Sequence, residues 1–258
     1  MFEVETYLRR IGFTGEREPT VETLRALHKG HLMSVAYDSS HFINSFTGFR
    51  NVVDIDIDRA FTDIVVNGNG GVCHDLNGLF RRLLAELGYD VAILAASQRW
   101  PNGRFGPDLE HTFGCVRIDG DTWLVDVGFA GPSYLEPLRV SDEVSHQYGC
   151  DYRLTEQGVY HVLERRDRSG DWRPVYRFEL RPREVAEWDS PERTGVGEVV
   201  GDSLFAGTAL RGRALPNGQL VLTGKRLLRV EDGYEKIRTL IDPAEYDSVV
   251  KDILAGNG

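Results

Sequence analysis

The chain is organised around residues 70–77, which read Gly70-Gly71-Val72-Cys73-His74-Asp75-Leu76-Asn77. After the cysteine, apolar residues recur with helical spacing at Leu76, Leu79, Phe80, Leu83, Leu84 and Leu87. This pattern predicts a helix with one apolar face that ends at Gly88, a residue typical of helix C-termini. Cys73 is therefore expected at the helix N-terminus, where unpaired N–H groups and the helix dipole favour a thiolate and lower the pKa of the thiol.

The composition is that of an ordinary globular protein. The 258 residues are 41% hydrophobic and 27% charged, and no run approaches the ~18 apolar residues that a membrane span requires. The N-terminus is acidic and lacks the basic and apolar regions of a signal peptide. A net charge of −10 argues against nucleic-acid and anionic-membrane partners. We therefore expect a cytoplasmic protein that binds neither nucleic acid nor membrane.

Cysteine and histidine spacing predicts no metal site. The cysteines include no Cys-x-x-Cys pair and are too few for a disulfide framework: Cys73, Cys115 and Cys150. The second and third are expected to be packing or loop cysteines. His28, His31 and His41 lie close together, but no carboxylate or cysteine spacing completes a ligand set. We therefore expect ordinary helix or loop histidines there.

Hydrophobic periodicity predicts a mostly helical first third. Before Cys73, helices are expected at 4–11, 20–35 and 58–66, with Thr20 as the cap of the second. The turn-forming residues Tyr37-Asp38-Ser39-Ser40 are expected to end that helix. His74 follows the cysteine directly, and we expect it to face solvent in the first helical turn.

The remainder of the chain is rich in predicted strands. Asp119-Gly120-Asp121 joins strands at 111–118 and 122–127 and is typical of a β-hairpin. Further strands at 90–97, 151–155, 159–166 and 172–180 predict an antiparallel barrel or sheet. The basic run Arg165-Arg166-Asp167-Arg168 is expected as a solvated hairpin tip, with carrier-protein docking as the alternative. After Glu187–Asp202, the expected linker, come short strands at 204–210, 219–223, 227–230 and 234–240 and a helix that starts at Asp242-Pro243.

A nucleophilic site is predicted from Cys73, His111 and Asp126. A cysteine nucleophile needs a base that holds it as thiolate, and the base needs an orienting acceptor. His111 begins one strand of the predicted hairpin and Asp126 lies near the end of the other, so we expect them as near or diagonal neighbours. Asp126 lies in an apolar run and is costly to bury without a partner, which His111 supplies.

These residues resemble the arylamine N-acetyltransferase family. The matching stretches are Gly70-Gly71-Val72-Cys73 with Asn77, His111-Thr112-Phe113 and Trp123-Leu124-Val125-Asp126-Val127-Gly128-Phe129. The resemblance implies an α+β fold with a helical bundle (1–88), an antiparallel β-barrel (89–188) and a C-terminal α/β lid (189–258). It also implies a papain-like triad of Cys73, His111 and Asp126, and no cofactor beyond an acyl thioester as co-substrate. The implied mechanism is ping-pong: the thiolate takes an acyl group from a thioester, and an amine then attacks the acyl-cysteine.

Several departures from the family pattern favour one of its branches. The family usually has arginine where Asn69 stands and glutamate where Asp75 stands, and its Phe-Glu-Asn motif is here Tyr37-Asp38-Ser39. The segment that the family associates with coenzyme A is here 197–205, which has no proline and two acidic residues. The Tyr-Asp-Ser variant and the run Gly106–His111 resemble the amide synthases of ansamycin-type polyketide biosynthesis. Those enzymes take a long acyl chain from an acyl carrier protein, and an aromatic amine on the same chain closes a macrolactam.

The amide synthase is thus our first functional hypothesis, and three alternatives remain. They are an arylamine N-acetyltransferase that uses acetyl-CoA on arylamines or hydrazines, a papain- or transglutaminase-like thiol hydrolase, and a non-catalytic protein that kept the fold. Water as the acyl acceptor would distinguish the hydrolase. The candidate substrate-binding residues are Tyr37, Gly71, Val72, Phe129 and Phe205.

Overall fold

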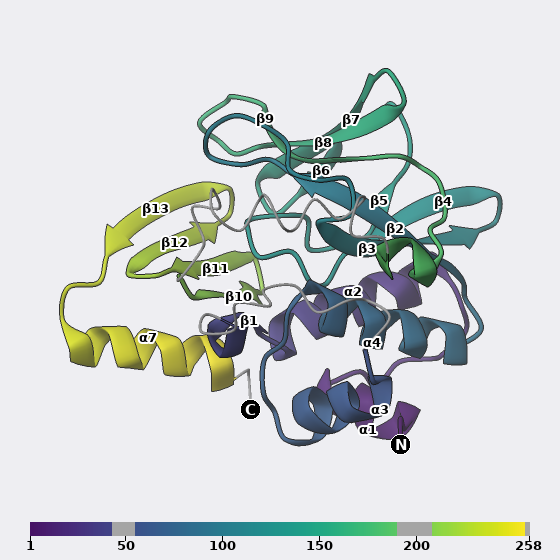
Figure 1. Cartoon of the computed structure of the whole chain (residues 1–258), viewed down its shortest axis with the longest axis horizontal. Helices are drawn as coiled ribbons and strands as arrows, with labels where there is room; N and C mark the ends of the chain where they lie inside the picture. The colour runs from purple at the N-terminus through teal and green to yellow at the C-terminus, as the bar shows by residue number, and fades with distance from the viewer. Residues whose placement is uncertain (43–54, 190–207, 256–258) are drawn as a thin grey trace.

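The computed structural model describes residues 1–42, 55–189 and 208–255. Figure 1 shows helices below a larger curved sheet, with a smaller sheet and the C-terminal helix to one side. This mixed architecture confirms the α+β class, whereas the division at residues 88 and 188 and the role of the last part as a lid stay predictions. Among the described helices, none has the length and apolar content needed to cross a bilayer.

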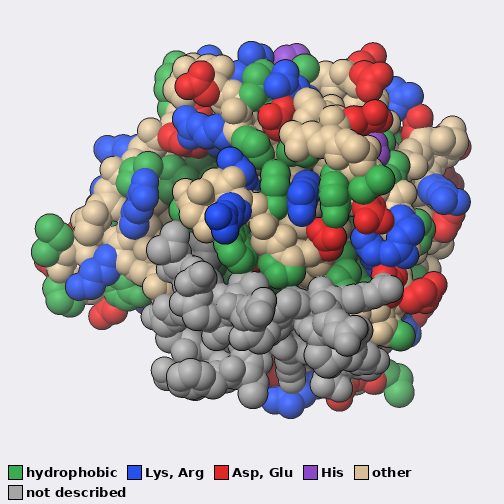
Figure 2. All heavy atoms as spheres, turned by 45° about the horizontal axis from the view of Figure 1, so that its top comes forward, with side chains coloured by type: hydrophobic (Ala, Val, Ile, Leu, Met, Phe, Trp, Pro, Cys, Tyr) green, Lys and Arg blue, Asp and Glu red, His purple; other side chains and the backbone are tan. Residues whose placement is uncertain are grey.

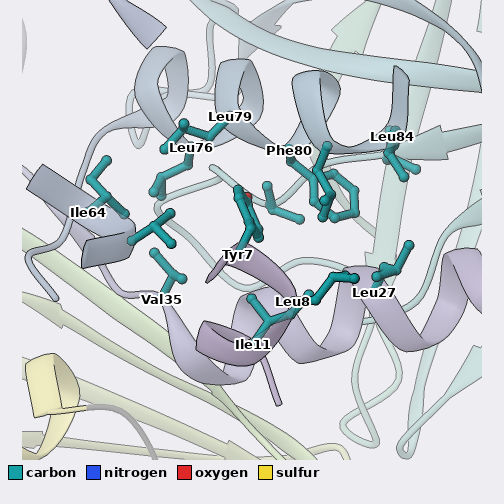
Figure 3. Close-up of a cluster of buried hydrophobic side chains, with 14 of the residues drawn as sticks. Tyr7, Leu8, Ile11, Leu27, Val35, Ile64, Leu76, Leu79, Phe80 and Leu84 are labelled. Carbon is teal, nitrogen blue, oxygen red and sulfur yellow. The ribbon is translucent and has the colours of Figure 1, made fainter. Parts of the chain in front are cut away.

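The described part of the first third, up to residue 86, is mostly helical, as predicted. Its elements are α1 (Val4–Arg10), α2 (Val21–Ser34), a 3-10 turn (Ser40–Phe42), α3 (Ile57–Ala60), a π-helical segment (Phe61–Val66) and α4 (Cys73–Glu86). Their apolar faces meet in one core, in which Tyr7, Leu27 and Phe80 are at most 1% exposed (Figure 3). Each such side chain contributes about 1.5–3 kcal/mol by burial. Thr20 caps α2 as predicted, because its hydroxyl oxygen accepts from the Thr23 N–H at 3.2 Å.

The larger sheet is an eight-stranded, near-closed antiparallel barrel (Figure 1). Its spatial order is β5 (Leu138–Arg139), β4 (Asp121–Val125), β3 (His111–Ile118), β2 (Asp90–Gln98), β9 (Arg173–Phe178), β8 (Tyr160–Arg166), β7 (Cys150–Gln157) and β6 (Ser145–Gln147). The predicted hairpin joins β3 and β4, and Asp119 and Gly120 both have positive φ, 51° and 85°. An Asp-Gly pair adopts this left-handed turn readily. The two short strands β5 and β6 were missing from the prediction.

The smaller sheet has five antiparallel strands and carries the C-terminal helix. Its order is β1 (Tyr37–Asp38), β10 (Leu210–Leu215), β11 (Gly218–Thr223), β12 (Arg226–Glu231) and β13 (Tyr234–Thr239), followed in the chain by α7 (Pro243–Ala255). Ile253 of α7 packs on Leu222 and Leu240 in a separate core. The turn predicted at 37–40 was wrong in part, because Tyr37 and Asp38 pair with Gly212 and Arg211. Local sequence patterns carry no sign of a partner so far along the chain.

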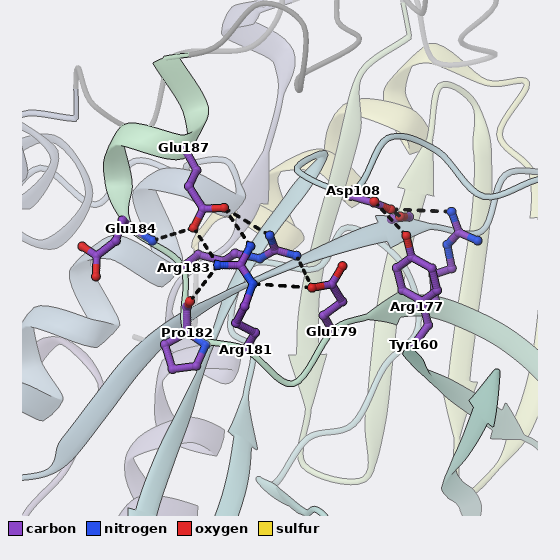
Figure 4. A network of polar contacts seen from close by, with 10 residues as sticks. Asp108, Tyr160, Arg177, Glu179, Arg181, Pro182, Arg183, Glu184 and Glu187 are labelled. Carbon is purple, nitrogen blue, oxygen red and sulfur yellow. Dashed lines mark hydrogen bonds and ion pairs between the residues drawn. The ribbon is translucent and has the colours of Figure 1, made fainter. Parts of the chain in front are cut away.

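Two other predictions need correction. The expected linker from residue 187 begins with ordered structure: a 3-10 turn spans Val185–Asp189, Trp188 is 4% exposed, and Glu187 accepts from Arg181 and Arg183 (Figure 4). The rest of the expected linker, residues 190–202, lies outside the described residues. The solvated tip predicted for the basic run was wrong in part: Arg168 is exposed in the turn, but the Arg165 side chain is 7% exposed and its Nη1 lies 2.5 Å from Glu235 Oε1. This ion pair ties the barrel to the smaller sheet.

Candidate active site

Cys73 is the first residue of α4, as predicted, and it is 6% exposed. The carboxylate of Asp75 accepts the Val72 N–H at 3.4 Å and so helps to close the first turn. The loop after β4 comes very close to this turn. A Cβ on Gly128 would lie 2.8 Å from Cys73 Cα and 2.7 Å from Asn77 Nδ2. Only glycine therefore fits at residue 128 without displacing the helix start.

His111 and Asp126 form the pair that the hairpin predicted. His111 Nε2 lies 2.7 Å from Asp126 Oδ2, and each residue is 1% exposed. The β3–β4 ladder ends with Gly114 opposite Val125. Asp126 directly follows this last pair, so its carboxylate reaches diagonally along β3 to the first residue of that strand. The His111 side chain also lies close enough to Cys73 to lower the pKa of its thiol. Cys73, His111 and Asp126 thus form one group of interacting polar side chains.

Asn77 joins the helix to β3 and to the segment that follows β4. Its Nδ2 donates to the Thr112 carbonyl at 2.7 Å and to Asp126 Oδ1 at 3.0 Å. Its Oδ1 accepts the Val127 N–H at 2.9 Å. Asp126 Oδ1 also accepts the Gly128 N–H at 3.1 Å. No positioning role was predicted for Asn77, although its place one turn after Cys73 on the same helix face was a usable signal.

The electrostatics favour a thiolate facing an imidazolium. Burial opposes ionisation of Cys73, but the nearby His74 and His111 side chains outweigh it and lower the pKa of the thiol to about 5. Burial likewise opposes the charge on His111, yet Asp126 and Cys73 together raise the pKa of its ring to about 10. Between these values the pair carries both charges. A cysteine held in this state is a ready nucleophile at neutral pH.

Aromatic rings enclose the His111 imidazole. Phe113 stacks on it with ring centres 6.0 Å apart, and Phe129 meets it edge-on at 5.4 Å. Tyr176 lies 5.8 Å away on the barrel side. Phe113 and Tyr176 are at most 2% exposed. These rings keep water from the His111–Asp126 bond and fix the plane of the imidazole. Phe129, a predicted substrate-binding residue, therefore lies beside the candidate site.

The other predicted substrate-binding residues have varied positions. Gly71 accepts the Asp38 N–H at 2.9 Å, which brings β1 and Tyr37 beside the segment that leads to Cys73. Burial and the nearby Cys73 raise the pKa of Tyr37, so its phenol stays neutral. A Cβ on Gly71 would lie 2.6 Å from Ile64 Cδ1, so a larger residue there requires the Ile64 side chain to move. Val72 is the cap residue of α4, and Phe205 lies outside the described residues.

The solvent-facing position predicted for His74 was wrong. The side chain is buried, with the residue 4% exposed, and its Nδ1 lies 3.0 Å from the Thr112 hydroxyl oxygen. Because α4 lies against β3 at its first turn, the residue after Cys73 faces the barrel instead of water. His74 thereby becomes one of the groups that lower the pKa of Cys73.

The segment before His111 is fastened to the barrel by two carboxylates. Glu110 accepts the Gln98 N–H at 3.1 Å and the Trp100 indole N–H at 2.9 Å. Asp108 accepts from the Ser97 and Tyr160 hydroxyls, each at 2.8 Å, and Figure 4 shows Asp108 between Tyr160 and Arg177. This anchoring fixes the start of β3 and hence His111. In the described part of the chain, no cluster of three or more His, Cys, Asp or Glu side chains is arranged for a metal ion.

A buried Cys–His–Asp set with its cysteine at a helix N-terminus is typical of enzymes that work through thioacyl intermediates. The chain matches the family model described as N-acetyltransferase over residues 20–255, and it therefore belongs to this family of acyltransferase enzymes. This confirms the family resemblance drawn from the sequence.

Relatives of known name support the same assignment. The chain is 44% identical to proansamycin X synthase of Amycolatopsis mediterranei, over 100% of this chain and 98% of that protein. It is 32% identical to the arylamine N-acetyltransferase of Mycolicibacterium smegmatis, over 81% of this chain and 80% of the relative. Among solved structures, the arylamine N-acetyltransferase of Mycobacterium marinum in complex with CoA is similar, with 26% identity and a TM-score of 0.82 over 98% of this chain and 93% of that one.

Proposed function

We propose that this protein is an amide-forming N-acyltransferase that works by a ping-pong mechanism through an acyl-Cys73 intermediate. The observation that carries the proposal is the buried placement of Cys73 at the start of α4 together with His111, which Asp126 holds at 2.7 Å. The shifted pKa values of Cys73 and His111 favour a thiolate and an imidazolium there. The pair supplies a nucleophile and a proton donor at neutral pH. Asp126 keeps the imidazole in the tautomer and orientation that both half-reactions need.

In the first half-reaction, the Cys73 thiolate attacks the carbonyl carbon of an acyl thioester. The carbonyl oxygen becomes an oxyanion beside the first turn of α4, where the helix N–H groups lack intrahelical partners. As the intermediate collapses, the C–S bond of the donor breaks, and His111 gives its proton to the departing thiolate. The products are acyl-Cys73, a neutral His111 and a free thiol.

In the second half-reaction, a neutral amine attacks the carbonyl carbon of acyl-Cys73. His111 accepts the proton that the amine nitrogen loses as the C–N bond forms. The bond to Cys73 Sγ then breaks, and the thiolate returns to its pairing with imidazolium. The product is an amide, and the aromatic enclosure of His111 disfavours water as a competing nucleophile.

We further propose that the acyl donor is a polyketide thioester on an acyl carrier protein, released as a macrolactam or aryl amide by an aromatic amine. The 44% identity to proansamycin X synthase over the whole chain supports this, against 32% to the Mycolicibacterium smegmatis arylamine N-acetyltransferase. The Tyr37-Asp38-Ser39 variant points the same way. Acetyl transfer from acetyl-CoA to an arylamine is the second candidate, and the CoA complex of the Mycobacterium marinum relative favours it.

On the face drawn in Figure 2, the described residues give little basis for carrier recognition by a single basic patch. Figure 2 shows basic and acidic side chains interspersed across this face. Several arginines are already paired, such as Arg177 with Asp108 at 3.6 Å and Arg181 with Glu187 at 2.9 Å. A carrier protein is therefore expected to be selected mainly through the acyl chain that it delivers.

The test compares donors and acceptors directly. The enzyme is incubated with acetyl-CoA or with a long acyl thioester on a carrier mimic, each with and without an arylamine, and amide and free acid are measured by mass spectrometry. Amide formed from the long thioester but not from acetyl-CoA supports the amide synthase. Amide formed from acetyl-CoA supports the acetyltransferase. Free acid at the same rate without amine would identify a hydrolase and overturn the proposal. Cys73→Ala is the control that makes neither product.

A further inference from the structure

A buried histidine lies beneath the backbone of Asp126. His28 of α2 is 0% exposed, and its Nε2 lies 3.1 Å from the Asp126 nitrogen. Its Nδ1 lies 2.9 Å from the Leu135 carbonyl oxygen. A peptide N–H can only donate and a carbonyl can only accept. The ring must therefore accept at Nε2 and donate at Nδ1, which fixes the neutral tautomer with its hydrogen on Nδ1.

Packing holds this ring in place. The imidazole stacks on Tyr134 with ring centres 5.7 Å apart and an interplanar angle of 15°. Its edge meets Phe80 at 5.9 Å. Phe80 belongs to α4, the helix that begins with Cys73, and both aromatic residues are 1% exposed. His28 therefore contacts the nucleophile's helix and the Asp126 backbone at once.

The hydrogen bond occupies a position that the sheet leaves open. The last β3–β4 pair is Gly114 and Val125, so the next N–H, that of Asp126, has left the ladder. His28 supplies the acceptor that a neighbouring strand would otherwise provide. The carboxylate of the same residue is held by His111, Asn77 and Gly128. Asp126 is thus fixed at its backbone and at both carboxylate oxygens.

We propose that His28 is a positioning residue: by accepting the Asp126 N–H, it keeps the Asp126 carboxylate in reach of His111 and so maintains the ionised Cys73. This inference rests on the proposed function only in taking Cys73, His111 and Asp126 as the reacting groups. Loss of the Nε2 acceptor leaves a buried N–H unpaired, and the backbone relieves this by moving. A small displacement at Asp126 lengthens its bond to His111 and weakens the charge that favours imidazolium.

The charges around His28 keep the ring in the accepting state. Burial lowers its pKa to about 4, although the Leu135 carbonyl and the carboxylates of Asp126 and Glu136 oppose this. The other titratable groups that face it are His31 on the same helix and the Tyr134 phenol. A proton on Nε2 would set one donor against another. Near neutral pH, the Asp126 N–H therefore keeps its acceptor.

The test uses three substitutions at residue 28 and a matched control. In His28→Gln, the amide oxygen can reach the place of Nε2 and accept, whereas in His28→Asn the shorter amide keeps only the bond to Leu135. His28→Leu places an apolar side chain of similar size in the same core and loses both hydrogen bonds. The control is His31→Leu: this equally buried histidine of α2 bonds to the Tyr7 hydroxyl at 2.8 Å and packs on Phe80.

The readout is the pH at which half of Cys73 is thiolate. The thiolate is monitored through its ultraviolet absorbance, and circular dichroism shows that each variant is folded. We expect His28→Leu and His28→Asn to raise the midpoint by about one unit or more, a tenfold change in the thiol–thiolate ratio. His28→Gln should stay within about half a unit of the wild type. His31→Leu should lower the denaturation midpoint and leave the thiolate midpoint unchanged.

Two results would overturn the inference: an unchanged midpoint in folded His28→Asn, or an equal rise in His31→Leu. If His28→Leu does not fold, the comparison of His28→Asn with His28→Gln still decides. The titration needs no substrate, so it is independent of the proposed reaction. A wild-type enzyme with a low thiolate midpoint that forms no amide would refute the proposed function and leave the assignment of His28 standing.

Discussion

Replacing Asp126 by asparagine removes the charge that stabilises the candidate site and keeps the volume. The asparagine oxygen can still accept from Asn77 and Gly128, as Asp126 Oδ1 does at 3.0 and 3.1 Å. Its NH2 group then faces His111 Nε2, which must accept instead of donate. The hydrogen of His111 moves to the nitrogen that faces Cys73. The imidazole can no longer take the proton of the thiol.

The structure sets the size of the effect. The pKa of Cys73 is about 5, against ~8.5 for a free thiol, and the pKa of His111 is about 10, against ~6.5. At about 1.4 kcal/mol per unit, the Cys73 shift corresponds to roughly 5 kcal/mol in favour of the thiolate. Without the Asp126 charge, His111 is neutral above pH ~6.5 and burial again opposes ionisation of the thiol. We expect the thiolate midpoint to rise by about three units.

The assay is a titration of the thiolate absorbance. A rate of alkylation at one pH is a poorer measure, because a thiolate of higher pKa is intrinsically more nucleophilic and offsets its lower population. The matched control is Asp167→Asn, which alters a buried aspartate, 6% exposed, that pairs with Arg173 at 3.3 Å away from the candidate site. A midpoint in Asp126→Asn within one unit of the wild type would show that the reasoning about this pair is wrong.

Three further predictions follow from the same geometry. Gly128→Ala should cost about 1–3 kcal/mol of unfolding free energy in urea titrations and slow acylation, because the new Cβ would lie 2.8 Å from Cys73 Cα. Normal stability and rate would contradict this packing. Glu235→Ala should cost about 3 kcal/mol, because it leaves the largely buried Arg165 guanidinium without its carboxylate, while acylation by the folded enzyme stays normal. The acylation rate should be nearly constant between pH 5 and pH 10, since the thiolate is protonated below about 5 and the His111 imidazolium is lost above about 10. A midpoint of the pH–rate profile near neutral pH would exclude the ion pair.

Local sequence patterns were enough to predict the parts of the site that depend on one element or one turn. The apolar spacing after Cys73 predicted α4, and the start of that helix follows directly from its pattern. Asp119-Gly120 predicted the hairpin, and the hairpin register brings His111 and Asp126 together. In both cases the decisive contacts lie within a helix or between strands joined by a two-residue turn. The roles of the three residues in catalysis stay a prediction.

The features that the sequence did not predict depend on packing between distant segments. β1 exists because Tyr37 and Asp38 pair with β10, far along the chain. His74 is buried because α4 lies on β3, and His28 reaches Asp126 because α2 lies under the end of β4. A histidine on a helix gives the same local sequence pattern whether it only fills the core or also bonds to a distant segment. Only the tertiary structure distinguishes a core histidine from one that holds the backbone of the candidate site.

The most direct test of the account is intact-mass measurement of the acyl-enzyme. The protein is mixed with an acyl thioester in the absence of amine, and peptide mapping locates any added acyl group. We predict one acyl group per chain, on Cys73, that is stable towards water and is discharged as an amide when an arylamine is added. Acylation at another residue, or amide formation at the wild-type rate in Cys73→Ala, would contradict the account.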